Sequence, residues 1–115
     1  MKDAKRNPRV YLEDILGAIA QIEKYTSEGK DQFMSDMKTK DAVIRQLSII
    51  GEASVKLPKN VREMSLDTPW KKIIGMRNII VHDYSHTDLP TIWDTIEQNL
   101  PMLKTTVETM LRAIS

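Results

Sequence analysis

Hydrophobic residues recur at three- and four-residue steps along most of the chain, which is the spacing of amphipathic helices. A first helix is predicted to begin at Pro8, since proline suits a first helical turn, with Asn7 as its cap. Gly29 is predicted to end it. The apolar side of this helix consists of Val10, Ile15, Ala18, Ile19 and Ile22.

A second long helix is predicted from Thr39 to Leu57, where Pro58 stops it. Its apolar face contains Val43, Ile44, Leu47, Ile49, Ile50, Ser54 and Leu57. The piece before it, residues 32–37, is ambiguous, and residues 61–64 are long enough for one helical turn.

A third helix is predicted from Trp70 to about Asp83, because the segment Asp67-Thr68-Pro69 is a typical helix start. A last helix is predicted from Thr87 to Ala113, bent or broken near Pro101. No segment shows the apolar–polar alternation of a half-buried strand. The sequence therefore predicts one all-α domain over residues 1–115, a bundle of four to five antiparallel helices joined by short loops.

Composition narrows the functional classes. The 115 residues are 41% hydrophobic and 29% charged, which is typical of a soluble globular domain. The absence of cysteine removes disulfides and thiolate sites and agrees with a cytoplasmic protein. No apolar run is long enough for a membrane span. The formal net charge is only +1, so composition by itself gives no support to a nucleic-acid partner.

The predicted third helix places a charge where apolar residues are expected. On a helical wheel Arg77 falls in the middle of the face formed by Trp70, Ile73, Ile74, Met76, Ile80 and Val81. Burying an unpaired charge costs several kcal/mol. Either a carboxylate such as Glu52 meets Arg77, or this face borders a wet cleft or a partner chain. Glu52 has three equal interpretations: it pairs with Arg77, lines a cleft or faces water.

A polar stripe runs along the flank of the same helix through Lys71, Gly75, Asn78 and His82. Lysine can meet a phosphate, asparagine can hydrogen-bond it, and histidine can move protons near neutral pH. Gly75 would let a ligand or another backbone come close. The plain alternative is a solvated polar edge. Arg77 and His82 are about 140° apart on an ideal helix, which favours a site at a dimer interface.

A metal site is not expected. His82 and His86 are four residues apart, a spacing found in helical metal sites. However, the helix is predicted to end near Tyr84, and no carboxylate completes a ligand set. The sequence indicates no other cofactor.

Residues 77–84 read Arg-Asn-Ile-Ile-Val-His-Asp-Tyr, which resembles the R-x-x-x-x-H-x-Y motif of HepT-like toxins in the HEPN superfamily. The resemblance extends to residues 41–45 and 49–53, which look like the family's second long helix. Residues 69–76 look like its lead-in to the motif. Leu89 and Ile92-Trp93 fit the segment that follows. The resemblance thus covers nearly the whole chain, and the motif is matched without a departure.

The resemblance implies a homodimeric, metal-independent endoribonuclease with its active cleft at the dimer interface. On that reading His82 is the general acid or base for attack by an RNA 2′-hydroxyl on the adjacent phosphate. Arg77 would stabilise the charge that develops on the phosphate. Asn78 would orient the phosphate or His82.

The resemblance also implies a partner. HepT proteins pair with MntA, a minimal nucleotidyltransferase antitoxin that adds AMP to the tyrosine of the motif, in a type VII-like toxin–antitoxin system. Tyr84 matches that position. An added AMP would obstruct an RNA cleft by its charge and size.

Two other functions remain open at this point. In the first, the chain is a binding module that partners a nucleotidyltransferase and holds nucleotide or RNA through Arg77 and Lys71 without cleaving it. In the second, it is a structural dimerisation domain in which Arg77 is a buried ion-pair partner.

Overall fold

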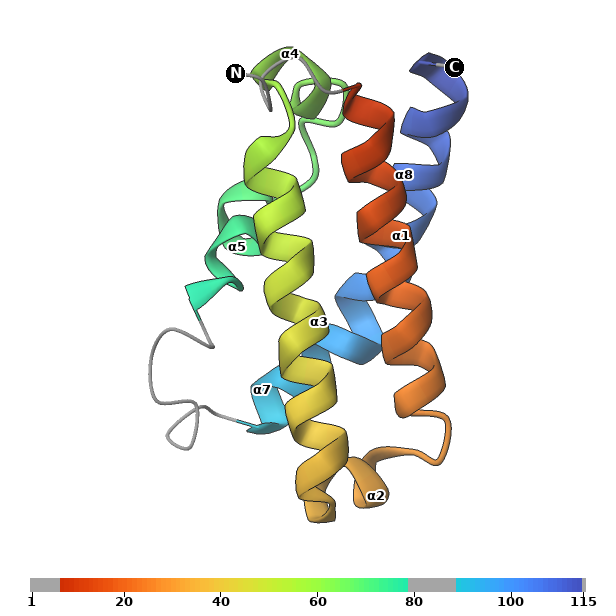
Figure 1. Cartoon of the computed structure of the whole chain (residues 1–115), viewed down its shortest axis with the longest axis vertical. Coiled ribbons are helices and arrows are strands. Elements are labelled where there is room, and N and C mark those ends of the chain that lie inside the picture. Colours follow the sequence, from red (N-terminus) through yellow and green to blue (C-terminus); the bar gives the residue numbers. More distant parts are fainter. Residues whose placement is uncertain (1–6, 79–88, 115) are drawn as a thin grey trace.

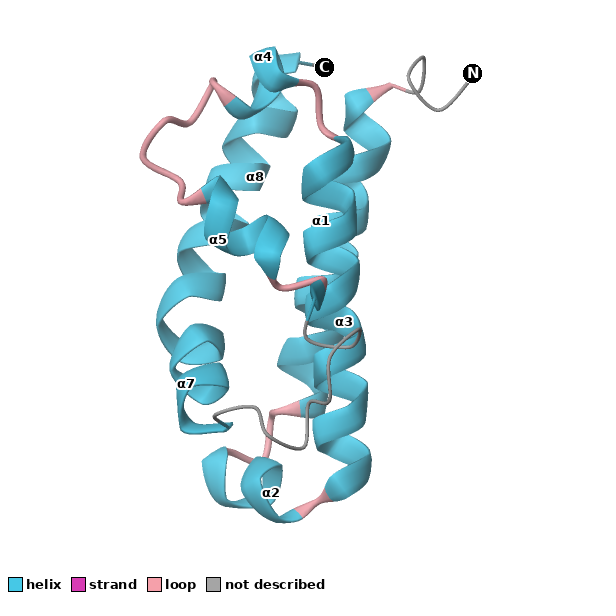
Figure 2. Ribbon diagram, turned by 90° about the vertical axis from the view of Figure 1, so that its left-hand side faces the viewer, coloured by secondary structure: helices cyan, strands magenta, loops and turns pink. Residues whose placement is uncertain are grey.

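Three long helices form the body of the molecule: α1 (Pro8–Tyr25), α3 (Met37–Lys56) and α8 (Leu100–Ile114). The structure is a computed structural model, and it describes residues 7–78 and 89–114. The three helices lie side by side, with α1 running opposite to α3 and α8 (Figures 1 and 2). This arrangement agrees with the predicted antiparallel bundle.

Shorter elements close the ends and one side of this bundle. They are α2 (Lys30–Ser35), α4 (Lys59–Arg62), α5 (Trp70–Gly75), α7 (Leu89–Asp94) and the π-helical segment η3 (Thr95–Asn99). α5 lies against α3, and α2 lies at the opposite end of α3 from α4 (Figure 1). Residues 7–78 and 89–114 contain helices and their connections but no strand. The predicted all-α fold is therefore confirmed for the described chain.

The helix ends follow local capping chemistry. The Asn7 side chain accepts a hydrogen bond from the Arg9 N–H at 2.9 Å, as predicted for the cap of α1. Asp36 caps α3 in the same way, accepting from the Lys38 N–H at 3.1 Å. α1 ends at Tyr25, earlier than predicted. Gly29 instead adopts a φ of 95° and begins α2, a conformation that glycine reaches without steric cost.

The last helical segment is interrupted beside Pro101, as the sequence predicted. Proline at this position lacks an N–H, and its ring would clash with the carbonyl four residues earlier. The chain widens into the π-helical turn η3, and the Leu100 N–H reaches back five residues to the Thr95 carbonyl. α7, η3 and α8 therefore form one long helical segment with a local widening rather than two separate helices.

The core is built from mainly aliphatic side chains, which come from the long helices and from the shorter elements. Its fully or almost fully buried members are Tyr11, Leu12, Ile15, Ala18, Ile19, Ile22, Phe33, Val43, Ile44, Leu47, Ile50, Ala53, Leu57, Val61, Ile73, Ile92, Trp93, Ile96, Leu100, Leu103, Val107 and Met110. Trp93 packs on Phe33 with ring centroids 5.4 Å apart, which joins α7 to α2. One continuous core thus links the elements on both sides of the undescribed segment.

The predicted third helix differs from the structure. A continuous helix was predicted from Trp70 to about Asp83, but α5 ends at Gly75, and Met76 and Arg77 form a turn. Glycine is a poor helix former, and the turn is tightened by hydrogen bonds that span three residues. The predicted wheel angle between Arg77 and His82 involves residue 82, which lies outside the described residues.

None of the helices in the two described ranges is both long enough and apolar enough to cross a lipid bilayer.

Candidate functional site

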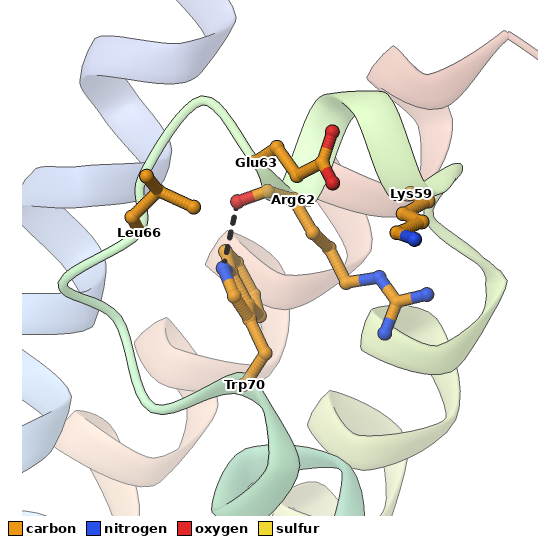
Figure 3. A pocket seen from close by; sticks show the side chains of 5 residues that line it. All are labelled: Lys59, Arg62, Glu63, Leu66 and Trp70. Carbon is orange, nitrogen blue, oxygen red and sulfur yellow. Dashed lines mark hydrogen bonds between the residues drawn. The ribbon is translucent and has the colours of Figure 1, made fainter.

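Trp70, the first residue of α5, fixes the start of this helix. The Trp70 indole N–H donates to the Arg62 carbonyl at 2.9 Å (Figure 3). It also donates to the Ser65 carbonyl at 3.1 Å. The side chains of the preceding Asp67-Thr68-Pro69 segment provide no cap to α5, although the sequence suggested one. The indole therefore ties the beginning of α5 to the end of α4.

The other end of α5 carries the candidate catalytic arginine. The Met76 N–H donates to the Ile73 carbonyl at 3.1 Å, and the Arg77 N–H donates to the Ile74 carbonyl at 3.2 Å. These two bonds hold Met76 and Arg77 in a tight turn. Arg77 is half-buried in this turn. The helical wheel placed it in the middle of an apolar face, so the prediction of burial is met only in part.

The backbone of Arg77 lies directly on α3. A Cβ atom placed on Gly51 would come within 2.6 Å of the Arg77 backbone nitrogen and 3.0 Å of both the Arg77 Cβ and the Ile74 carbonyl oxygen. Real Cβ atoms essentially never show a separation below 3.0 Å, such as the one to the Arg77 nitrogen, and the two 3.0 Å separations are tighter than most real contacts. The lack of a side chain at Gly51 is thus what allows the turn that carries Arg77 to reach α3.

Arg77 has no ionic partner in the described part of the chain. Its sequence-predicted partner, Glu52, makes no ion pair with it and is exposed on α3. Arg9–Glu13 and Lys104–Glu23 are ion pairs on the surface of the described part of the chain. The guanidinium of Arg77 is therefore not neutralised by any carboxylate within residues 7–78 and 89–114.

Glu52 belongs instead to a groove between α1 and α3. This groove has a volume of about 290 Å³ and is lined by Tyr11, Asp14, Arg45, Ser48, Ile49, Glu52, Ala53 and Lys56. It carries two acidic and two basic side chains, so it has no dominant sign of charge. Glu52 is exposed and lines this groove, which does not include Arg77 or the other residues of the predicted site.

Lys71, Gly75 and Asn78 are all exposed, as a solvent-facing stripe requires. Apart from its chain neighbours and the backbone of its own helix, no atom of the described residues lies within 4 Å of the position that a Cβ on Gly75 would take. Within the described chain, a close backbone contact is made at Gly51, where the Arg77 turn lies against α3. Asn78 follows Arg77 directly, so its side chain is available to solvent next to the arginine.

His82, Tyr84 and His86 lie outside the described residues, so the motif is described only at its first two positions, Arg77 and Asn78. Within the described ranges, no three histidine, aspartate or glutamate side chains gather in a way that could hold a metal ion.

A second pocket lies at the start of α5. It has a volume of about 240 Å³ and is lined by Lys59, Arg62, Glu63, Leu66 and Trp70 (Figure 3). The Arg62 Nε atom is buried there without a hydrogen-bond partner among the described residues. Leu66 is 82% exposed at its rim. Sequence reasoning missed this pocket, because its residues come from two short helices and the loop between them.

Gly51 is the site residue that sequence reasoning left without a role. It entered only as part of the resemblance to a family helix. The available signal was its position inside a long helix, where glycine weakens helix formation and often marks a close backbone approach.

The chain can now be compared with known proteins. The family model "Ribonuclease HepT-like" matches residues 15–110. This chain belongs to the HepT-like ribonuclease family. The match includes the Arg77 turn, the Gly51 contact and the whole of the predicted motif.

Individual relatives agree with this assignment. A Thermococcus cleftensis protein named "Probable ribonuclease HepT" is 41% identical over 101 residues, which cover 87% of this chain and 92% of the relative. A "Putative RNase" of Caldanaerobacter subterraneus subsp. tengcongensis is 38% identical, covering 93% of this chain and 96% of its own. A "Putative RNase" of Methanocaldococcus jannaschii is 35% identical, covering 94% of each chain. No solved structure matches the chain significantly. The family supports a ribonuclease that acts on RNA.

Proposed function

We propose that this chain is the toxin of a type VII-like toxin–antitoxin system and cleaves RNA without a metal ion, using Arg77, Asn78 and His82. The observation that carries the proposal is the state of Arg77. Its backbone is held against α3, while its guanidinium has no carboxylate partner among the described residues. An unpaired guanidinium carried on a fixed backbone is suited to a phosphate, which it can contact through two parallel hydrogen bonds.

The proposed reaction is an internal transesterification of RNA. His82 accepts the proton of a ribose 2′-hydroxyl, and the 2′-oxygen attacks the adjacent phosphorus. The bond from phosphorus to the 5′-oxygen of the next nucleotide breaks, and that oxygen takes up a proton. The products are a 2′,3′-cyclic phosphate and a 5′-hydroxyl. Arg77 stabilises the added negative charge on the phosphoryl oxygens, and Asn78 orients the phosphate.

The proposed active form is a homodimer with the cleft at its interface. Gly75 supports this arrangement, since the space beside it is open and would admit a second backbone. The test mixes two inactive variants, Arg77→Met and His82→Ala, after unfolding and refolding them together. A site that takes Arg77 from one subunit and His82 from the other regains activity in mixed dimers. Mixed dimers that stay inactive would contradict a shared site.

Control by a partner is proposed at Tyr84. A nucleotidyltransferase of the MntA type would join the Tyr84 oxygen to the α-phosphorus of ATP, releasing pyrophosphate and the phenolic proton. The product carries AMP next to the motif, where its phosphate repels an RNA backbone. Since RNA is the substrate, the proposed place of action is the cytoplasm.

The first experiment compares the parent protein with His82→Ala on labelled RNA in EDTA. Cleavage by the parent alone, with cyclic or 3′-phosphate ends, supports the metal-independent mechanism and the role of His82. An equally active His82→Ala protein would contradict it. If neither protein cleaves, intact mass shows whether the parent already carries AMP. An unmodified, folded and inactive parent favours a binding module that holds RNA without cutting it.

The modification is tested with the cognate nucleotidyltransferase and ATP, read by mass spectrometry. The chain has three tyrosines, and Tyr11 is only 3% exposed, so Tyr25 is the matched control. Tyr84→Phe should remain unmodified and active, while Tyr25→Phe should gain AMP and lose activity. AMP on the Tyr84→Phe protein would overturn the assignment of the site.

A further inference from the structure

One glycine of the chain differs from the other three. Among the described residues, a Cβ atom on Gly17, Gly29 or Gly75 would meet no neighbouring segment within 4 Å, so no close contact requires glycine at those positions. Of the four glycines, Gly51 is the one at which an added methyl group would disrupt a contact, the one with the backbone of Arg77. It lies inside the 20-residue helix α3, where glycine is among the least favourable residues. Its presence there is explained by the contact and not by helix formation.

The contacted atoms belong to the backbone of the arginine turn. The methyl group of an alanine at position 51 would collide with the Arg77 nitrogen and with the Ile74 oxygen. These two atoms form the hydrogen bond, 3.2 Å long, that closes the turn. Neither atom can rotate away as a flexible side chain would. Relief requires the turn to move by about 1 Å, to reach an ordinary van der Waals separation.

Because the start of α5 is held in place, a shift caused by a methyl group at position 51 should occur mainly at Arg77. Trp70 is held by two hydrogen bonds to the carbonyls of Arg62 and Ser65. Ile73, one turn further along, is 8% exposed and packs in the core. α5 is therefore anchored at its beginning and in its middle, and the turn at its end is the part that can yield.

We infer that Gly51 is a positioning residue for catalysis: it sets the distance between α3 and the backbone of Arg77, and thereby the place of the guanidinium on the scissile phosphate. This inference rests on the proposed function. Gly51 itself touches no substrate, and its effect passes through Arg77. Misplacing a catalytic group by 1 Å lowers rates by about 100-fold.

The test compares Gly51→Ala with two controls on an RNA substrate. Gly17→Ala adds the same methyl group inside α1, where nothing lies within 4 Å. Ile73→Val weakens the packing of α5 without touching the turn. All proteins are assayed at a temperature at which circular dichroism shows them to be folded. Gly51→Ala should lower kcat by about 100-fold with little change in KM. Both controls should keep the parent kcat. A Gly51→Ala enzyme with the parent kcat would overturn the inference.

A double-mutant cycle separates positioning from a general structural effect. If Gly51 acts through Arg77, adding Gly51→Ala to an Arg77→Met protein should cause no further loss of activity. Independent effects would multiply instead, and that result would overturn the inference.

A last measurement needs neither a variant nor activity. In the parent protein the Arg77 amide is bonded to Ile74 and covered by α3, so its hydrogen exchange should be slow. The Lys72 amide, bonded to the Pro69 carbonyl in the exposed first turn of α5, is the internal reference and should exchange faster. Fast exchange at Arg77 would overturn the contact. Slow exchange in a protein that cleaves no RNA would leave the contact intact and overturn only the proposed function.

Discussion

Helix α3 meets its neighbours in two different ways. In the core that it shares with α1, both helices contribute large aliphatic side chains that are at most 1% exposed. Those of α1 are Leu12, Ile15, Ile19 and Ile22, and those of α3 are Val43, Ile44, Leu47 and Ile50. Toward α5, α3 offers Gly51, and the backbone of the arginine turn lies against it.

These two kinds of packing should have different effects, one on the stability of the protein and the other on the position of Arg77. Interlocking aliphatic side chains bury most of the apolar surface, and they can change rotamers when one neighbour changes. A backbone packed on a glycine buries little, but it has no such freedom. The α1 side should therefore set how stable the protein is, and the α5 side should set where Arg77 lies.

The largest effect on stability is expected from a substitution in the core between α1 and α3. Leu47 is 1% exposed, and Leu47→Ala should lower the free energy of unfolding by about 2–5 kcal/mol, because it removes buried methyl groups and leaves a cavity. Chemical denaturation followed by circular dichroism measures the change. Leu47→Met, which nearly conserves volume, is the control and should cost less than about 1.5 kcal/mol. A loss below 1 kcal/mol in Leu47→Ala would show that this core is looser than its burial indicates.

A smaller effect is expected where α5 is tied to α4. Trp70→Phe keeps the aromatic packing but leaves the Arg62 and Ser65 carbonyls without the indole N–H. The loss should be about 1–2 kcal/mol, since net contributions of about 1 kcal/mol are typical for each hydrogen bond. The shift in the denaturation midpoint reports it. An unchanged midpoint would mean that water replaces the indole at no cost, and that Trp70 holds α5 by packing alone.

Most of the fold followed from local patterns in the sequence. The cap at Asn7, the stop at Pro58 and the interruption at Pro101 each depend on residues within one helical turn, so the sequence contains the whole cause. The end of α1 was predicted too late. Gly29 was taken as its stop, whereas the chain leaves the helix at Thr26 and uses the positive φ of Gly29 to begin α2.

The candidate site could be predicted only in part, because its geometry is set by contacts between distant segments. Periodicity placed Arg77 on an apolar face, and the structure places it half-buried. The turn at Met76 and Arg77 was missed, since Gly75 was read as part of a continuous helix. A contact between residues 51 and 77 leaves no periodic signal, so the close approach at Gly51 could not be found from periodicity.

The smallest effect on stability is expected from Arg77→Met, and this variant best tests the difference between the α1 side and the α5 side of α3. Arg77→Met keeps most of the aliphatic stem and removes the charge. If Arg77 has no ionic partner, as in the described chain, the free energy of unfolding should change by no more than about 0.5 kcal/mol, which is usual for substitutions that break no specific interaction. RNA cleavage should nevertheless fall by about 100-fold or more, since the charge is then used only on the substrate.

The opposite result has an equally definite meaning. Breaking a buried ion pair by removing one partner costs about 3–5 kcal/mol. A loss of that size in Arg77→Met, measured by the same denaturation experiment, would make Arg77 a structural residue paired with a carboxylate. The turn on Gly51 would then hold the two halves of an ion pair together, and the α5 side of α3 would contribute to stability as the α1 side does. Near-parent stability together with lost cleavage would instead assign the two faces of α3 to different tasks.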